Sequence, residues 1–317
     1  MNKVVRKLKQ FAAELIPNRW LRIVARPMVA PRAYAEIVSE AERIVDLQRI
    51  ESFDKFYWTQ LLRKNVHMID KGLQRDDCEP GHSSPIYKKT IEILAHLDVN
   101  ESLEDPSVSW AAETLSEYRS FQETGVPTRV PAATWPAYNC LLEGIKSRRS
   151  IRSFREERID IELLNKVLEP LPWAASSCNR QPARVYATLD PDLVVQCMAN
   201  CSGATGFSSF VPAFLCFCAD RRAYAMPREI WLPVLDTALG IQNCALTAHS
   251  LGLSLTLLSW AAHSPQQDKG LRKLLGIPEH YQIVVNAVMG FPKRGVPAPL
   301  RKPFAQTLVL RSRANSE

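Results

Sequence analysis

Apolar residues in the first third of the chain recur at three- and four-residue intervals, the spacing of one face of a helix. The stretch AYAEIVSEAERIVDLQRIESFDKFYWTQLLRKNVHMIDKGL keeps this period, and SSPIYKKTIEILAHLDV and EDPSVSWAAETLSEYRSFQETG continue it. Gly125 follows the last periodic residues, where a glycine commonly ends a helix. We therefore expect residues 31–122 to be helical.

A proline-rich stretch separates this part from the rest. VPTRVPAATWPAYN holds three prolines and reads as a linker. The pattern thus predicts a helical N-terminal extension over residues 1–137 and a second domain over residues 138–317.

The second part alternates between strand-like and helix-like segments. Short apolar runs predict strands in RVYATLD, FVPAFLCFCAD, LSLTLLSW and YQIVVNAVMGF, and the stretches between them have helical periodicity. We expect an α+β fold in which helices flank a mixed sheet. Neither G-x-G-x-x-G nor G-x-x-x-x-G-K occurs, so a bound nucleotide would need something other than a glycine loop for its phosphate.

Composition places the chain among soluble globular proteins, with 46% hydrophobic and 23% charged residues. No apolar run has the length needed to span a bilayer, and we expect no signal peptide because the start lacks a small-residue cleavage site. The eight cysteines lie mostly in apolar surroundings and the six histidines are scattered. We therefore expect reduced thiols, no metal site and a cytoplasmic protein.

The net charge of +7 is concentrated at one end, because residues 1–30 hold seven basic residues and one acidic residue. The near-neutral remainder argues against a protein built to bind nucleic acid. Apolar residues from Val4 to Ile16 have helical spacing and predict a basic amphipathic helix. Such a helix packs on its own protein, the interpretation we favour, or makes a peripheral contact with the anionic inner face of a membrane.

The octapeptide SRRSIRSF opens the second domain with a cluster of basic and hydroxyl side chains. Guanidinium groups bind a phosphate monoester through parallel charged hydrogen bonds, and a serine hydroxyl adds another. The candidate phosphate ligands are Arg148, Arg149, Ser150 and Arg152. A solvated basic loop explains this stretch about equally well when it is taken alone.

A second polar cluster follows in AASSCNRQPARVY, between a predicted helix and a strand. Its hydroxyl and carboxamide groups donate and accept hydrogen bonds at close range, which would suit the pyrimidine edge of an isoalloxazine ring. The candidates are Ser176, Ser177, Asn179 and Gln181. A plain helix end and turn is the alternative.

Together the two segments resemble the nitroreductase family of FMN-dependent oxidoreductases. The family patterns are R-R-S-x-R-x-F and, after a helix, roughly P-S-S-x-N-x-Q-P-W, and residues 148–154 and 175–183 follow them. The stretches DTALGIQNCALTAHSLGLSLTLLSW, LRKLLGIPEHYQIVVNAVMGFPK and LRKPFAQTLVL resemble later family segments in the same order. The resemblance covers residues 140–310 and implies a nitroreductase-like fold.

The resemblance also implies which residues contact FMN. Arg148, Arg149, Ser150 and Arg152 match the family positions that hold the phosphate and ribityl chain, and Arg301 or Lys302 matches a late basic residue that reaches the phosphate.

On the ring side, Asn179 matches an asparagine near the flavin ring. Ser259 and Trp260 fall where family backbone approaches the flavin N5 edge.

The implied activity is transfer of hydride from NADH or NADPH to flavin N5, and then to a small conjugated or carbonyl-type acceptor. Family members are usually homodimers with FMN at the subunit interface, so we expect a homodimer that takes a small-molecule substrate. No residue is assigned as general acid or base.

Ala183 replaces a bulky aromatic residue of the family pattern, which would open space or alter packing near the flavin. Two alternatives to the implied activity stay open. The protein could bind flavin as a scaffold or partner protein without NAD(P)H turnover, or it could consume its own flavin.

Overall fold

The structure, a computed structural model, describes residues 55–75, 77–97, 105–126, 137–224, 229–261 and 263–311. It divides the chain into two compact units, which we describe separately. The basic segment 1–30 and the predicted helices before residue 55 lie outside the described residues. The boundary predicted near residue 137 stays a prediction.

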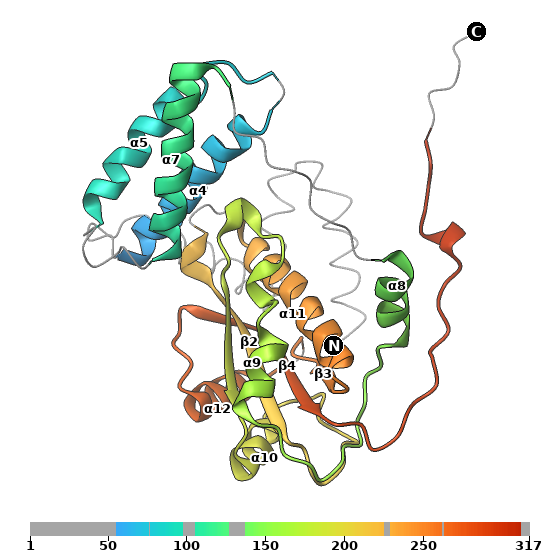
Figure 1. The fold of residues 1–317 in the computed structure, drawn as a ribbon. Coiled ribbons are helices and arrows are strands. Elements are labelled where there is room, and N and C mark those ends of the chain that lie inside the picture. The colour runs from blue at the N-terminus through green and yellow to red at the C-terminus, as the bar shows by residue number, and fades with distance from the viewer. Residues whose placement is uncertain are drawn as a thin grey trace, which may run out of the picture. The chain divides into compact units, whose positions relative to one another are not determined.

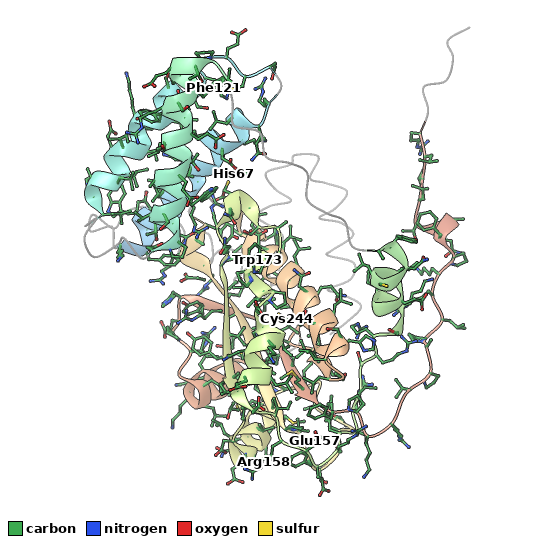
Figure 2. The ribbon with its side chains drawn as sticks, viewed as in Figure 1. His67, Phe121, Glu157, Arg158, Trp173 and Cys244 are labelled. Carbon is green, nitrogen blue, oxygen red and sulfur yellow. The ribbon has the colours of Figure 1, made fainter. Side chains whose placement is uncertain are left out.

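Three helices make up most of the described first unit: α4 (Lys55–Leu73), α5 (Ser84–His96) and α7 (Pro106–Thr124) (Figure 1). Their apolar faces pack on one another through Leu62, Val66, Ile93 and Ala111, which are almost fully buried. Phe121, labelled in Figure 2, is 1% exposed and extends this packing along α7. The helical periodicity read from the sequence is thereby confirmed for these segments.

Both ends of α7 follow the local rules for helix termini. The side chain of Asp105 caps the start by accepting a hydrogen bond from Ser107 N at 2.8 Å. Gly125 takes the left-handed conformation at the end, with φ of 66°. The predicted stop at Gly125 is confirmed.

The first unit also includes residues 176–182 and 220–236 from the second half of the sequence. These segments carry the 3-10 turns η2 (Ser177–Asn179) and η3 (Arg221–Ala223) and the first residues of α11 (Leu232–Ser250). Helix α4 contacts both turns, and the guanidinium carbon of Arg222 lies 4.1 Å from the ring centre of Phe56. The three helices are therefore grouped with two loops that follow them in the sequence by more than forty residues.

The second unit is built on a four-stranded sheet with the order β1-β2-β4-β3. Strand β1 (Ala183–Thr188) runs antiparallel to β2 (Ala213–Asp220), and β3 (Ser254–Leu258) runs antiparallel to β4 (Tyr281–Gly290). All four strands lie where the apolar runs predicted them, and the α+β fold is confirmed.

Helices cover both faces of this sheet (Figure 1). All eight residues of β2 are buried, so alternate side chains enter two different cores. Leu215 and Phe217 pack with α9 (Ile161–Leu168) and α11, whereas Phe214 and Cys216 pack with α10 (Pro191–Ala199) and α12 (Pro265–Leu275).

The buried thiols belong to these cores. Cys244 of α11, labelled in Figure 2, is 0% exposed, and burial raises its pKa to about 12. Burial likewise raises the pKa of Cys197 to about 11. These two thiols are therefore neutral near pH 7, and both are free and buried; their burial agrees with the sequence prediction.

Two negative findings apply to the part of the chain that the structure describes. None of its helices is both long and apolar enough to cross a membrane. It also holds no group of three or more His, Cys, Asp or Glu side chains arranged to hold a metal ion.

Gly290 at the end of β4 permits a close contact with Phe154. A Cβ atom at position 290 would lie 2.6 Å from Phe154 Cδ1 and 2.9 Å from Pro212 Cδ. We expect Gly290→Ala to lower the free energy of unfolding by about 1–3 kcal/mol, because the buried ring must move. Urea unfolding followed by circular dichroism measures the change.

Gly295→Ala is the matched control, since a Cβ there would meet no atom within 4 Å. Equal unfolding midpoints for the two variants would contradict this packing.

Candidate functional site

Two hydroxyl groups of β3 hold the segment that carries the arginine cluster. Thr256 Oγ1 accepts a hydrogen bond from Ile151 N at 2.9 Å and donates one to Ile151 O at 2.8 Å. Ser254 Oγ donates to Arg149 O at 3.1 Å. Because Ile151 itself is buried, this arrangement fixes the flanking residues Ser150 and Arg152 at the surface.

The next residues run beside two other segments of the second unit. Phe154 forms an isolated antiparallel bridge with Pro292. Three backbone hydrogen bonds support this arrangement: Lys293 N to Ser153 O at 3.0 Å, Arg155 N to Phe291 O at 2.9 Å, and Ser208 N to Arg152 O at 2.8 Å. Segments around residues 152, 208 and 293 are therefore neighbours, although they are far apart in the sequence.

These three segments enclose a pocket of about 320 Å³. It is lined by Ser150, Ile151, Arg152, Ser153, Gly206, Phe207, Ser208, Arg294 and Val296. The guanidinium carbon of Arg152 lies 5.9 Å from the ring centre of Phe207. The pocket thus combines two guanidinium groups with serine hydroxyls, the donor set that an anionic oxygen cluster requires.

The other two arginines of the cluster are used differently. Arg148 caps the C-terminus of α8 (Tyr138–Ser147). Arg149 Nη1 donates to Lys146 O at 2.5 Å and to Arg148 O at 2.9 Å, and Arg149 Nε is buried without a partner in the described structure. Neither side chain lines the pocket.

The late basic residues also lie away from the pocket lining. Arg301 and Lys302 are exposed in the segment before η5 (Phe304–Gln306). Arg294, which sequence reasoning missed, lines the pocket instead. The sequence shows the basic pair Lys293-Arg294 separated from the last strand by two residues, but the tertiary contacts that bring the pair beside Arg152 cannot be read from the sequence.

Ser259 and Trp260 follow β3 in the same unit. Ser259 is exposed, whereas Trp260 is 5% exposed and its ring stacks on His263 with a centroid distance of 4.5 Å. A Cβ on Gly203 would lie 2.7 Å from Ser259 N, so only a glycine allows that chain segment to approach so closely. The Trp260 side chain belongs to the core, and only its backbone and Ser259 stay available as ligands.

The second polar cluster lies in the first unit and forms a tight turn. Three of its non-glycine residues have left-handed backbone, with φ of 55° at Cys178, 53° at Asn179 and 50° at Gln181. Such conformations cost about 1–3 kcal/mol each and persist where surrounding contacts enforce them. The turn is therefore a strained element held in shape.

Many polar groups of this turn form hydrogen bonds with other residues of the first unit. Ser177 donates from its N and its Oγ to the Asp236 carboxylate at 2.7 and 3.2 Å. Ser176 Oγ accepts from Gln181 N at 3.1 Å, and Gln181 Nε2 donates to Asn179 Oδ1 at 2.7 Å. These hydrogen bonds hold the turn in shape.

A buried charged network lies behind the turn. Arg180 is 4% exposed, pairs with Glu229 at 3.1 Å and stacks on the Tyr224 ring at 4.8 Å. Tyr224 in turn donates a very short hydrogen bond to Asp236. Burial and the Asp236 carboxylate raise the pKa of Tyr224, so the phenol stays protonated and serves as a donor.

Comparison with known proteins identifies the family to which this chain belongs. A sequence profile of the nitroreductase family matches residues 145–200 and 210–291. A protein of Archaeoglobus fulgidus named as an NADH dehydrogenase/NAD(P)H nitroreductase is 31% identical over 157 residues, which cover 48% of this chain and 85% of that protein. The chain belongs to the nitroreductase family.

Two further comparisons agree with nitroreductase membership. A Bacillus subtilis protein named as an NAD(P)H-dependent FMN reductase is 24% identical over 169 residues, covering 49% of this chain and 66% of that protein. The crystal structure of a nitroreductase-like protein from Streptococcus mutans covers 56% of this chain and 100% of that one, at 15% identity and a TM-score of 0.50. The latter likeness shows the nitroreductase fold.

The hydrogen bonds from β3 to Ile151, which we call the β3 clamp, can be tested through Thr256, which is 1% exposed. We expect Thr256→Val to lower the free energy of unfolding by about 1–3 kcal/mol, because it removes the donor to Ile151 O and leaves Ile151 N only its longer hydrogen bond to Ser254 Oγ at 3.3 Å. Thr205→Val, the same change at an exposed loop position, serves as the control. Equal stability of the two variants in urea unfolding would refute the clamp.

Proposed function

We propose that this chain is an FMN-dependent oxidoreductase that takes hydride from NADH or NADPH and passes it to a small conjugated or carbonyl-type acceptor. Membership of the nitroreductase family supports the reaction class, and so do the relatives named for NAD(P)H nitroreductase and FMN reductase activity. The observation that carries the proposal is the pocket in which Arg152 and Arg294 meet the serine hydroxyls of residues 150 and 153.

The donor set of this pocket fits the terminal phosphate of FMN. A phosphate monoester carries nearly two negative charges near neutral pH and presents three acceptor oxygens. Two guanidinium groups balance that charge, and serine hydroxyls supply further donors. The volume of about 320 Å³ is also larger than one phosphate requires, which leaves room for part of the ribityl chain.

Different residues of the chain would then bind the phosphate and the ring of FMN. Arg152 and Arg294 hold the phosphate, and backbone at Ser259 approaches the ring edge. We propose Asn179 and Gln181 as ring contacts on the basis of their family positions and the rigid turn that carries them. When bound, the flavin supplies the atom that accepts and donates hydride, and the protein supplies binding and orientation.

We expect the purified protein to bind FMN and to lose its yellow absorption when NADH or NADPH is added without oxygen. Arg152→Gln with Arg294→Gln should weaken FMN affinity by about tenfold or more per arginine, given about 1.5–3 kcal/mol for each charged hydrogen bond. Quenching of flavin fluorescence on titration gives the affinity.

Arg158→Gln is the control, because Arg158, labelled in Figure 2, is exposed in the same unit and is absent from the pocket lining. Wild-type affinity in the double variant would contradict the phosphate assignment. Bound flavin that NADH and NADPH both leave oxidised would contradict the NAD(P)H reaction.

We further propose a homodimer, on the basis of two elements of the second unit that expose apolar side chains. No residue of α8 is buried, although Leu141 and Ile145 are apolar. The segment from residue 299 to 311 is exposed throughout and carries Leu300, Phe304 and Leu310. Both lie apart from the sheet in Figure 1, and apolar surface of this kind is typical of an interface.

We expect sedimentation velocity to show a dimer at micromolar concentration, and Leu141→Asp with Ile145→Asp to shift it to monomer, because charges would be buried at the interface. Val195→Asp on α10 introduces the same charge at another exposed apolar residue, which is 62% exposed, and should leave the dimer intact. A monomeric wild-type protein would refute the proposal.

A further inference from the structure

A buried arginine of helix α4 forms a hydrogen bond to the strained turn of residues 176–181. Arg63 of α4 is 8% exposed, and its Nη1 donates to Asn179 O at 2.8 Å. Burial lowers the pKa of Arg63, and nearby Asp105 opposes that shift. The charged group is therefore kept in a costly environment, and its hydrogen bonds must offset the loss of hydration.

Other contacts fix the direction of the Arg63 guanidinium. Its Nε donates to Ser107 Oγ at 2.9 Å, and its carbon lies 5.9 Å from the ring centre of Trp110. Ser107 and Trp110 both belong to α7, so two helices of the extension position the donor that reaches Asn179. The planar guanidinium donates to Ser107 Oγ and Asn179 O at the same time in a fixed geometry. A lysine ammonium on its flexible stem lacks this fixed arrangement of donors.

The Asn179 carbonyl is a sensitive place for such a contact. Cys178, Asn179 and Gln181 all hold left-handed backbone, and the Asp236 carboxylate fixes the start of the turn through Ser177. Arg63 holds the middle of the turn through the peptide that joins Asn179 to Arg180. Without this hydrogen bond, Asn179 could relax to an ordinary backbone conformation and its carboxamide would change direction.

We infer that Arg63 is a positioning residue, through which the helical extension sets the conformation of the turn that contacts the flavin ring. This inference rests on the proposed function. It gives the extension a defined task in the cofactor site: α4 and α7 together supply the anchor that keeps Asn179 in its binding conformation.

The test compares wild type with Arg63→Met, Arg63→Lys and the control Arg119→Met, which alters an exposed arginine of α7. Amide hydrogen exchange is measured for residues 177–181, and FMN affinity and the visible spectrum of bound FMN are measured on the same proteins. Arg63→Met should speed exchange in the turn while α4 and α7 keep their protection.

We further expect Arg63→Met to weaken FMN affinity by about tenfold or more, the effect of one charge-assisted hydrogen bond, and to shift the visible bands of the bound flavin. Arg63→Lys keeps one charged donor and should restore part of both properties. It also carries the test if Arg63→Met does not fold. Arg119→Met should behave as wild type.

The failures are distinguishable. Unchanged exchange at residues 177–181 in both Arg63 variants overturns the inference whether or not flavin binds. A loosened turn with wild-type FMN affinity and spectrum also overturns it, because the anchor is then structural only. If wild-type protein binds no FMN, the proposed function fails, and the inference fails with it, whatever the exchange data show.

Discussion

The pocket lined by Arg152 and Arg294 depends on the hydrogen bonds that the Thr256 hydroxyl makes to Ile151. This hydroxyl satisfies both backbone groups of Ile151, and so forces the residues on either side to face outward. The octapeptide SRRSIRSF would otherwise be a solvated basic loop. Because its middle is held against β3, the short segment can run beside Pro292 and Ser208 and form one side of a pocket.

The strained turn of residues 176–181 shows a second use of buried polar groups. Three left-handed residues in four positions are unfavourable in isolation, and the turn persists because charged side chains hold it from two directions. Asp236 binds Ser177, and Arg63 binds Asn179. Such pre-organisation suits a site that must present a carboxamide in one orientation, because the ordering cost is met during folding.

Sequence reasoning located the strands and the helix end at Gly125 because these depend on local periodicity and backbone preference. It also singled out Ser150 and Arg152 as candidate ligands, and both line the pocket. It could not separate them from Arg149, whose guanidinium caps α8, nor find Arg294, which reaches the pocket through a tertiary bridge. The hydrogen bond from Arg63 to Asn179 could not be predicted from the sequence either, because its acceptor is a backbone carbonyl, which every residue carries.

Phosphorus NMR of FMN bound to this protein tests the central claim most directly. A free phosphate monoester takes up its second proton near about pH 6 and its resonance moves accordingly. If Arg152 and Arg294 hold the phosphate, the bound resonance should stay at the dianion position from about pH 5 to 8, since the guanidinium groups favour the charged form. A bound resonance that titrates like that of free FMN would contradict the account.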